Sequence, residues 1–447
     1  MSPGAAVRAG RLLTARILLD LAYLLATPFV VLWLAVPSRL YTRRRYRAGL
    51  RQKLGSVEPR SGTAPCLWIH AVSVGELRAA LPLVEALRQG LPAWDIRVST
   101  STDTGQDLAA RSLPAGVLPF YFPLDYGWAV RRTLRRVRPA AVVLLELELW
   151  PNFLIACGSL GIPVLVANGR ISARSFPRYR RLGALARSLF RAVTAFAAQD
   201  QEYARRFGAL GVPGQRIEVL GNLKYDGEPR PSDPAETLAL LGWAGGEGFP
   251  PPPVLVAGCT HPGEEEALLE SWATLRSDHP ALRLVLAPRH IERASGVVAL
   301  AGSRAGAGNV RTWSEAQGRR AALPAAPILV VDRIGELDRF YRIADVAFVG
   351  GSLIPRGGHN LLEPSRLGRP ILFGPWVENF REIADHLLAR GAAVQILDAA
   401  GLSAEIRRLL ADRAAREDLG TRALAAAREL GGASARHAAW IRRILGA

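Results

Sequence analysis

The stretch ADVAFVGGSLIPRGGHNLLEPSRLGRPILF, residues 344–373, decides the fold of this chain. An apolar run at Ala344–Val349, broken only by Asp345, ends in glycines, and a second apolar run begins at Pro370. A polar segment of helical character separates the two runs, so the pattern predicts a strand, a turn, a helix and a second strand. Apolar runs that alternate with helices are typical of parallel strands joined by crossover helices. The sequence therefore predicts an α/β fold.

The turn inside this stretch predicts a nucleotide site. Here a strand ends in glycines and a helix begins shortly after it. The first backbone N–H groups of such a helix have no partner within the helix and lie at the positive end of its dipole, where phosphate binds. Asn360 and Glu363 lie three residues apart on one face of the predicted helix. An amide and a carboxylate placed in this way can hydrogen-bond to the two hydroxyl groups of a ribose. Glycine-rich turns also occur in α/β proteins that bind nothing there. The glycines that let the backbone approach a ligand are Gly350, Gly351, Gly357 and Gly358.

The same alternation of strand and helix runs through most of the chain. In the first half we expect strands at 66–70, 96–100, 140–145, 163–167 and 195–198. In the second half we expect them at 254–258, 284–287, 328–331, 346–349 and 371–373. Polar sequences follow these strands, and ligands of such sheets bind beyond the carboxyl ends of the strands.

The length of 447 residues favours two domains of roughly 200 residues each. A Pro- and Gly-rich segment, 227–253, is interpreted as the connection between them. We therefore predict an N-terminal segment at 1–38, a first α/β domain at 39–230 and a second at 231–447, with a cleft between the two sheets. The three cysteines are far apart and form no CxxC, which predicts neither disulfides nor a zinc site and favours a reducing compartment.

The net charge of +18 is carried almost wholly by arginine, since Lys53 and Lys224 are the only lysines among 57 basic residues. Retention of an ammonium at Lys224, in GNLKYD, indicates a specific role there. Basic residues cluster at 39–60, 131–138 and 170–191, and no acid occurs between Glu148 and Asp200. Such clusters suit either nucleic acid or an anionic membrane.

The N-terminal segment favours the membrane. Residues 17–36, ILLDLAYLLATPFVVLWLAV, carry one charge, Asp20, and match the roughly 20 residues that cross a bilayer. Basic residues are denser after this segment than before it, which predicts that the bulk of the protein lies on the cytoplasmic side. Asp20 and Pro28 leave open a helix that lies in the interface, and a buried core helix is a further alternative.

Acidic residues at strand ends are the candidates for catalysis. Glu76, after HAVSVG, can remove a proton from a hydroxyl if burial raises its pKa enough to offset the lowering by the helix dipole. The alternative is that Glu76 only stabilises the start of the helix by interacting with its dipole. Glu146 and Glu148 are predicted on one face of a strand end, where acidic residues are costly unless they are functional or paired with neighbouring arginines.

Eight motifs in order, HAVSVGE, LELELWPN, NGRIS, GNLKYD, LAPRH, IGEL, ADVAFVGGSL and GGHNLLEP, resemble those of the 3-deoxy-D-manno-octulosonic acid (Kdo) transferase family of lipopolysaccharide synthesis. The resemblance runs from about residue 17 to about residue 430 and implies a GT-B fold, two Rossmann-like domains that face each other across a cleft. It also implies an inverting transfer of Kdo from CMP-Kdo to the lipid A precursor lipid IVA, with no metal required. The location that follows is the inner membrane, with anionic lipid as a partner and no nucleic acid.

The resemblance also implies roles for single residues. Glu76 matches the family's proton acceptor, and Glu146 and Lys224 match positions that stabilise the transition state, with Glu148 as an alternative to Glu146. The segments that match CMP-binding positions are Pro288 with Arg289, Ile334 with Gly335 and Glu336, and Asn360, Leu361, Leu362 and Glu363.

Three other functions remain open at this point. A membrane-associated GT-B enzyme could use a different nucleotide sugar, because strand-end glycines and a ribose carboxylate serve either nucleotide. A tethered nucleotide-binding protein without turnover and a nucleic-acid-binding protein are the others. The number of Kdo residues transferred and the oligomeric state are not fixed by the sequence.

Overall fold

The computed structural model describes residues 23, 25, 49–227, 231–246, 250–318 and 326–447. The chain forms two compact units, one of residues 1–227 and 431–447 and the other of residues 228–430. The predicted membrane segment, 17–36, lies outside the described residues except for Tyr23 and Leu25, which are helical. Among the residues described, no helix has both the length and the apolar character needed to cross a bilayer.

The first unit is built on a parallel sheet of seven strands in the order β3-β2-β1-β4-β5-β6-β7. The central strands are buried along their whole length, as expected for a sheet covered on both faces. The strands are β1 Cys66–His70, β2 Asp95–Thr100, β3 Leu118–Tyr121, β4 Ala141–Leu145, β5 Val164–Gly169, β6 Ala195–Ala198 and β7 Ile217–Val219.

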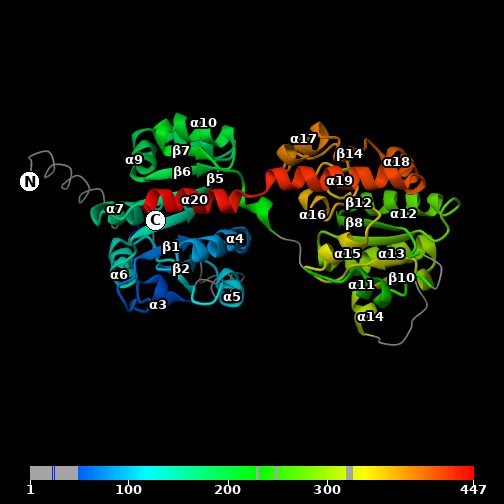
Figure 1. The fold of residues 1–447 in the computed structure, drawn as a ribbon, viewed down its shortest axis with the longest axis horizontal. Coiled ribbons are helices and arrows are strands. Elements are labelled where there is room, and N and C mark those ends of the chain that lie inside the picture. The colour runs from blue at the N-terminus through cyan, green and yellow to red at the C-terminus, as the bar shows by residue number, and fades with distance from the viewer. Residues whose placement is uncertain (1–22, 24, 26–48, 228–230, 247–249, 319–325) are drawn as a thin grey trace, which may run out of the picture. The chain divides into compact units, whose positions relative to one another are not determined.

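Helices connect these strands and cover the sheet (Figure 1). They are α3 Leu50–Lys53, α4 Val74–Gly90, α5 Asp103–Ser112, α6 Gly127–Val137, α7 Pro151–Ser159, α8 Phe176–Arg181, α9 Ala184–Ala192, α10 Gln201–Ala209 and α20 Ala433–Leu445, with 3-10 turns η2 Gly214–Arg216 and η3 Leu223–Asp226. Side chains cap the helices that begin beside strand ends, as Ser73 does for α4 and Thr102 for α5.

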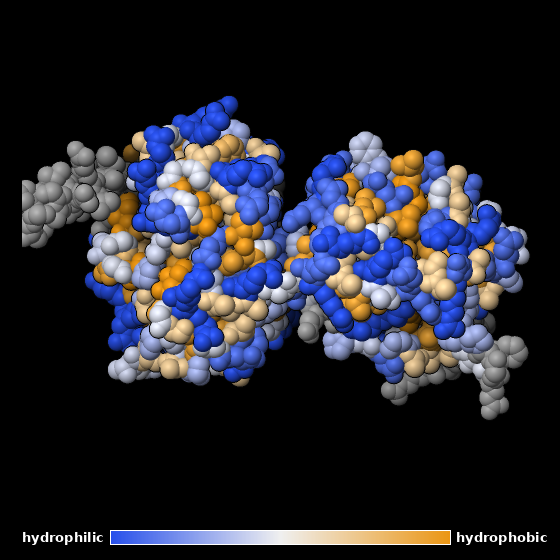
Figure 2. All heavy atoms as spheres, turned by 45° about the horizontal axis from the view of Figure 1, so that its top comes forward, coloured by the Kyte–Doolittle hydropathy of each residue, from blue (hydrophilic) through white to orange (hydrophobic). Residues whose placement is uncertain are grey.

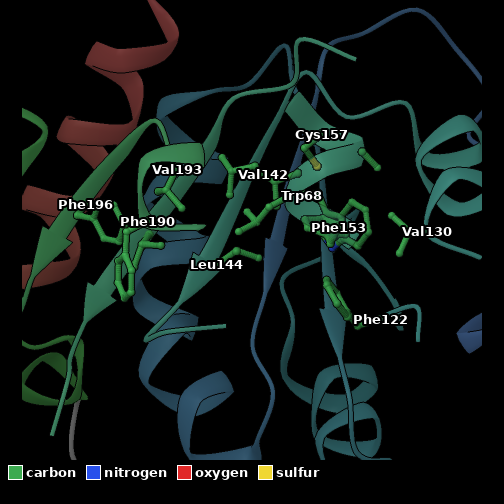
Figure 3. Packing of buried hydrophobic residues seen from close by; sticks show 14 of the residues in the cluster. Trp68, Phe122, Val130, Val142, Leu144, Phe153, Cys157, Phe190, Val193 and Phe196 are labelled. Atoms are coloured by element: carbon green, nitrogen blue, oxygen red, sulfur yellow. The ribbon is translucent and has the colours of Figure 1, made fainter. Parts of the chain in front are cut away.

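Alternate residues of each strand feed two separate cores, one on each face of the sheet. Trp68 of β1 points into the first core, where its ring packs against Phe120, Phe122 and Phe153 at centroid distances of 5.1, 5.7 and 5.2 Å. Figure 3 shows this aromatic group beside Val142 and Leu144 of β4. The neighbouring residues Leu67 and Ile69 enter the second core.

The second unit repeats the architecture with a parallel sheet in the order β10-β11-β9-β8-β12-β13-β14. The two sheets confirm the predicted α/β fold. The strands are β8 Val254–Thr260, β9 Arg283–Pro288, β10 Val310–Thr312, β11 Ile328–Val330, β12 Val346–Val349, β13 Ile371–Phe373 and β14 Val394–Gln395. The helices are α11 Pro234–Leu240, α12 Glu264–Leu275, α13 Ala294–Ala305, α14 Trp313–Gly318, α15 Leu337–Ile343, α16 Leu362–Ser365, α17 Arg381–Ala389, α18 Ala399–Ala411 and α19 Arg413–Leu430, with 3-10 turns η4 Ile291–Arg293 and η5 Ala307–Asn309.

Both sheets reverse their strand order at one place. In the first sheet the chain proceeds outward from β1 to β2 and β3, then returns to add β4 on the other side of β1. In the second sheet the same reversal lies between β8 and β12. Connections that leave two neighbouring strands in opposite directions open a crevice at their carboxyl ends, which is where doubly wound sheets bind ligands.

The C-terminal helix α20 belongs to the first unit, whereas the sequence placed residues 231–447 together in the second domain. Its apolar face, which includes Trp440 and Ile441, is buried in the second core of the first sheet, beside residues of α4 (Figure 1, red helix). Such a return depends on long-range packing, which local sequence patterns do not report. At the other end of the second unit, α11 packs against α15, so much of the segment interpreted as a connection is part of this unit.

The surface mixes charged and apolar residues. On the face drawn in Figure 2, hydrophilic residues cover most of the surface and hydrophobic residues form patches between them. In the first unit the exposed apolar side chains include Leu182 and Leu185, which are 50% and 56% exposed within the arginine-rich segment 170–191.

The placement of α20 gives a prediction about stability. Ile441→Ala removes a fully buried side chain from the second core of the first unit, so we expect it to lower the free energy of unfolding of that unit by about 2–5 kcal/mol. Hydrogen–deuterium exchange should then increase in β1, β4 and α4. Ile406→Ala, equally buried in the second unit, is the matched control and should increase exchange there instead. Increased exchange across β8–β14 in the Ile441 variant would contradict the assignment of α20.

Candidate functional site

In the first unit, acidic and basic side chains gather at the strand-order reversal. Glu76 lies in the first turn of α4, directly after β1, and Glu146 and Glu148 follow β4, the neighbour of β1. Lys224 lies in η3, after the edge strand β7. Residues from three distant parts of the sequence are therefore close together at the carboxyl end of one sheet.

The carboxylate of Glu76 is fixed by two hydrogen bonds. Its Oε2 accepts from the backbone N–H of Val72 at 2.9 Å and its Oε1 accepts from the hydroxyl of Ser73 at 2.9 Å. Ser73 Oγ in turn accepts from the N–H of Glu76, so Ser73 is the N-cap of α4 and is tied to Glu76 by two hydrogen bonds. Burial raises the pKa of Glu76 above its usual value, and the charge of Glu146 adds to the rise, while these hydrogen bonds and Lys224 oppose it. Glu76 is thus both a helix cap and a carboxylate that takes up a proton more readily than an exposed one.

Glu146 forms an ion pair with Lys224. The Lys224 Nζ lies 2.9 Å from Glu146 Oε1, and Arg170 Nη1 lies 4.0 Å from the other carboxylate oxygen. β4 ends at Leu145 as predicted, but Glu146 and Glu148 do not share one face of the strand end, because Glu146 adopts a positive φ of 57°. This left-handed residue turns the chain out of the sheet and brings the carboxylate to the lysine.

Glu148 has a different environment from Glu146. Its Oε2 accepts from the indole N–H of Trp150 at 3.0 Å, and it forms no ion pair with any residue that the structure describes. Burial, with the charges of Glu76 and Glu146, raises the pKa of Glu148 to about 7. Three carboxylates that influence one another electrostatically, one of them neutralised by an ammonium, form a group able to hold and release a proton near neutral pH.

The turn that carries Lys224 is held by buried polar residues. Asn168, at the end of β5, accepts from the Leu223 N–H through Oδ1 at 3.0 Å, and its own N–H donates to His437 Nε2 at 3.1 Å. The carboxylate of Asp226 accepts from the first N–H groups of α20, including that of Ala433 at 3.1 Å. Local sequence patterns do not reveal the roles of His437 and Asp226, because residue 437 lies 269 residues after Asn168. Helix α20 therefore positions Lys224.

In the second unit, the glycine-rich turn after β12 does not offer the free N–H groups that the sequence predicted. The N–H groups of Gly351, Ser352 and Leu353 donate to the buried carboxylate of Glu264, at 2.8, 3.0 and 3.0 Å. The N–H of His261 is a further donor to Glu264, at 3.1 Å. The anion site formed by this turn is thus occupied by the protein's own carboxylate, and an external phosphate must be bound by other groups.

The glycines of this turn also serve the fold. A Cβ at Gly350 would lie 2.6 Å from the carbonyl oxygen of Cys259, and one at Gly357 would lie 2.3 Å from Asn379 Nδ2. Gly351, Gly357 and Gly358 have positive φ angles of 68°, 84° and 74°. Small residues are required here because the loop packs against its own neighbours.

Asn360 and Glu363 are in contact, although not on one helix as predicted. The helix α16 begins only at Leu362, and Asn360 lies in the turn before it, with Oδ1 accepting from the Leu362 N–H at 3.1 Å. Asn360 Nδ2 lies 3.4 Å from Glu363 Oε1. Burial, with the charge of Asp338, raises the pKa of Glu363 to about 7, against the opposing effects of Asn360, Arg366 and Arg289.

The remaining predicted nucleotide-binding residues lie at or after the carboxyl ends of β9, β11 and β12 of the same sheet. Pro288 ends β9, and the charge of the next residue, Arg289, acts on Glu363. The side chain of Ile334 is 80% exposed, and Glu336 Oε2 lies 3.5 Å from Arg339 Nε. The turn between these two residues is Gly335, with a φ of 85°, and the side chains of Leu361 and Leu362 are buried. Leu361 and Leu362 can therefore contact a ligand through their backbone, whereas Arg289, Asn360 and Glu363 can do so through side chains.

Metal binding has no candidate in the part of the chain that is described. No three histidine, cysteine, aspartate or glutamate side chains come together there in an arrangement that could hold an ion. The two groups of candidate residues belong to different units, Glu76, Glu146 and Lys224 to the first and Arg289, Asn360 and Glu363 to the second.

The role of Glu264 can be tested by stability. Glu264→Leu leaves the buried N–H groups of the turn without an acceptor, and each such loss costs about 1–3 kcal/mol, so we expect the free energy of unfolding to fall by about 3 kcal/mol or more. Denaturant unfolding measures the fall. Glu264→Gln keeps one acceptor oxygen and should cost less, and Glu266→Leu, in the same turn of α12 but partly exposed, should cost least. Equal stabilities of the Glu264 and Glu266 variants would show that the turn does not depend on this carboxylate.

Comparison with known proteins identifies the family. The family model described as 3-deoxy-D-manno-octulosonic-acid transferase (kdotransferase) matches residues 48–227. The 3-deoxy-D-manno-octulosonic acid transferase of Haemophilus influenzae is 34% identical over 387 residues, which cover 84% of this chain and 86% of that protein. The enzyme of the same name from Bordetella pertussis is 32% identical over 410 residues, covering 87% and 90%.

Solved structures support the fold. The UDP-GlcNAc 2-epimerase of Neisseria meningitidis bound to UDP-GlcNAc is 12% identical, with a TM-score of 0.56 over 86% of this chain and 100% of that one. HepE of Anabaena in complex with UDP is 15% identical, with a TM-score of 0.55 over 86% and 99%. These likenesses concern the fold alone. The relatives confirm what the order of motifs predicted: the chain is a glycosyltransferase and belongs to the 3-deoxy-D-manno-octulosonic acid transferase family.

Proposed function

We propose that this protein transfers Kdo from CMP-Kdo to the lipid A precursor lipid IVA, with inversion at the sugar and without a metal. The observation that carries the proposal is the group of Glu76, Glu146 and Lys224 at the strand-order reversal of the first sheet. Family membership supports the donor sugar, and the Arg289, Asn360 and Glu363 group supports a nucleotide in the second unit. In this proposal the protein is a GT-B enzyme whose first unit, which includes α20, binds the acceptor and whose second unit, residues 228–430, binds CMP-Kdo.

Glu76 acts as the general base. Its carboxylate removes the proton from the acceptor hydroxyl as that oxygen attacks the anomeric carbon of Kdo. The attack comes from the face opposite CMP, so the bond from sugar to phosphate breaks with inversion and its electrons leave on the phosphate. Burial supports this role, because a base whose pKa lies above that of an exposed carboxylate accepts the proton with less free-energy cost.

Charged side chains stabilise the transition state in place of a metal. Glu146 and Lys224 are the proposed pair, and the 2.9 Å contact supports Glu146 over Glu148 as the partner of the lysine. Ammonium and guanidinium groups can neutralise the charge that develops on a leaving phosphate. The Glu148 carboxylate, with a pKa near neutrality, can exchange protons with its neighbours in the same group.

The acceptor is a lipid, and we propose that the protein is bound to the inner membrane with its catalytic domains on the cytoplasmic side. The apolar segment 17–36 is the proposed anchor, either spanning or interfacial. The arginine-rich segment 170–191, with exposed Leu182 and Leu185, supports binding to anionic lipid.

The first test is the loss of the base. Glu76→Gln removes the proton acceptor, and general-base catalysis is worth about 100-fold or more, so we expect transfer to fall by at least that factor while CMP still binds. Mass analysis of the glycolipid formed from CMP-Kdo and lipid IVA measures transfer and also counts the Kdo residues added. Glu85→Gln, on the exposed face of the same helix, is the control and should leave transfer unchanged. Transfer retained by the Glu76 variant would remove Glu76 from this role.

The pH dependence gives a second measure of the same base. Since the pKa of Glu76 is raised, kcat/KM should decline below a midpoint that lies above the pKa of an exposed glutamate. Glu146→Gln removes a negative charge that contributes to the rise, so the midpoint should move to lower pH. If the midpoint of the fall in kcat/KM at low pH is the same in this variant as in the wild-type protein, Glu76 is not the titrating group.

The donor nucleotide is tested by binding. We expect CMP, but not UMP or UDP, to raise the melting temperature of the protein, since a ligand that binds only the folded state stabilises it. Glu363→Gln should reduce the rise, while Glu270→Gln, exposed on α12, should not. Stabilisation by UDP instead of CMP would favour the alternative, a membrane-associated GT-B enzyme that uses a different nucleotide sugar.

A further inference from the structure

Two histidines form a hydrogen-bonded pair at the strand-order reversal of the second sheet. His261 Nε2 lies 2.9 Å from His359 Nε2, and the rings are stacked with centroids 5.2 Å apart and planes within 4°. His261 directly follows β8, and His359 lies in the turn after β12, the neighbour of β8. None of the roles proposed above uses either residue.

The backbone around the pair is adapted to it. A Cβ at Gly351 would lie 2.9 Å from His359 Cδ2, so a larger residue would push the ring out of place. Glu264 holds both sides of the pair, since it accepts from the N–H of His261 and from the N–H of Gly351. The pair is thus a built feature of the turn.

The charges around the pair are mostly positive. The groups that act on His359 are Arg289, His261 and His290, and those that act on His261 are Arg356, His290, Glu265 and Arg293. Glu265 forms an ion pair with Arg293, which donates two hydrogen bonds of 3.0 Å to its carboxylate. The guanidinium groups of Arg289 and Arg356 form no hydrogen bond or ion pair with any described residue. Glu265 is neutralised by Arg293, and the carboxylate of Glu264 accepts hydrogen bonds from backbone N–H groups of the turn. Arg289 and Arg356 therefore bring positive charge to the pair that no described residue neutralises.

The hydrogen bond fixes how many protons the pair can offer. One Nε2 must donate and the other must accept, so the neutral pair carries one Nδ1–H donor and one bare Nδ1. Neither Nδ1 atom has a partner among the described residues. Addition of one proton keeps the bond between the Nε2 atoms and turns the bare Nδ1 into a second donor. The protonated pair can therefore present two N–H groups and one positive charge to an anion.

In the free protein the pair is neutral. Burial and the neighbouring cations lower the pKa of His359 to about 4, and they also lower the pKa of His261. A bound anion would reverse the electrostatic part of this effect, because it favours the charged form of an imidazole beside it. Ligand binding and proton uptake are then linked.

We infer that His261 and His359 bind an oxyanion of the donor, its phosphate or its sugar carboxylate, and take up a proton as they do so. This inference rests on the proposed function. Arg289 connects the two parts of the site, because its charge acts on His359 and also on Glu363. The ribose at Asn360 and Glu363 and the anionic group at the histidines would then be neighbouring parts of one ligand.

Isothermal titration of the full-length protein with CMP, in two buffers of different ionisation enthalpy, measures the protons taken up on binding. For the wild-type protein we expect net uptake, and an affinity that weakens by up to about tenfold per pH unit as the pH rises above neutrality. His359→Gln and His261→Gln should each reduce the uptake and flatten the pH dependence. CMP and Glu363 also titrate in this range, so the difference between wild type and variant is the quantity that isolates the pair.

His279→Gln is the matched control, since His279 precedes the amino end of β9 and lies away from the carboxyl ends. Cytidine, CMP and free Kdo distinguish the two anions: an effect of the variants on CMP but not on cytidine assigns the phosphate, and an effect on free Kdo assigns the carboxylate. If the wild-type protein and both histidine variants take up the same number of protons on binding CMP and on binding free Kdo, the inference is overturned. The proposed function would still stand in that case. Failure of the wild-type protein to bind CMP would overturn the proposed function itself.

A measurement on the unmodified protein covers the case in which the variants do not fold. The imidazole Cε1–H resonances of the wild-type protein, followed by NMR against pH, should show two histidines that remain neutral near neutrality without ligand and become protonated with saturating CMP or Kdo. Titration curves that do not change on saturation with either ligand would equally refute the inference.

Discussion

The structure depends on one topological constraint, the reversal of strand order in each parallel sheet. Neighbouring strands β1 and β4, and likewise β8 and β12, send their following segments in opposite directions, so their carboxyl ends are left uncovered by connections. The carboxylates Glu76 and Glu146 and the two histidines follow these strands directly, whereas Lys224 reaches the first reversal from the turn after the edge strand β7. Glu76 and Glu146 share the first reversal, and His261 and His359 share the second. The fold thus gathers residues that are distant in sequence without any long loop.

The two reversals use their backbone differently. At the first, the N-cap residue Ser73 is hydrogen-bonded to Glu76, whose carboxylate is partly buried beside other acids. At the second, the N–H groups that could bind phosphate donate to Glu264 instead. Side chains are therefore the groups left to bind a ligand there. Side chains can change protonation and backbone amides cannot. Both candidate sites therefore contain groups whose pKa values are shifted towards or through neutrality.

Much of the fold could be predicted from local patterns, and the exceptions have physical reasons. The buried strands β12 and β13 are continuous apolar runs, and their predicted bounds match the observed ones. The edge strands β7, β10 and β14 were missed because they are short, partly exposed and carry no apolar run. β3 is apolar but contains Pro119, a residue found in sheets mainly on edge strands. The sequence indicated that Glu146 and Lys224 matter, but their contact required the left-handed turn at Glu146. The histidine pair gave no local signal, since its members are 98 residues apart.

The return of α20 to the first unit has a consequence for biosynthesis. His437 and the start of α20 hold the turn that carries Lys224, so more than two hundred residues separate that turn from its support. Translation proceeds from the amino end, and domains usually fold as they emerge from the ribosome. Here the apolar core around α4 is complete only after α20 has been synthesised. The surface that α20 covers is therefore exposed on the nascent chain throughout synthesis of the intervening unit.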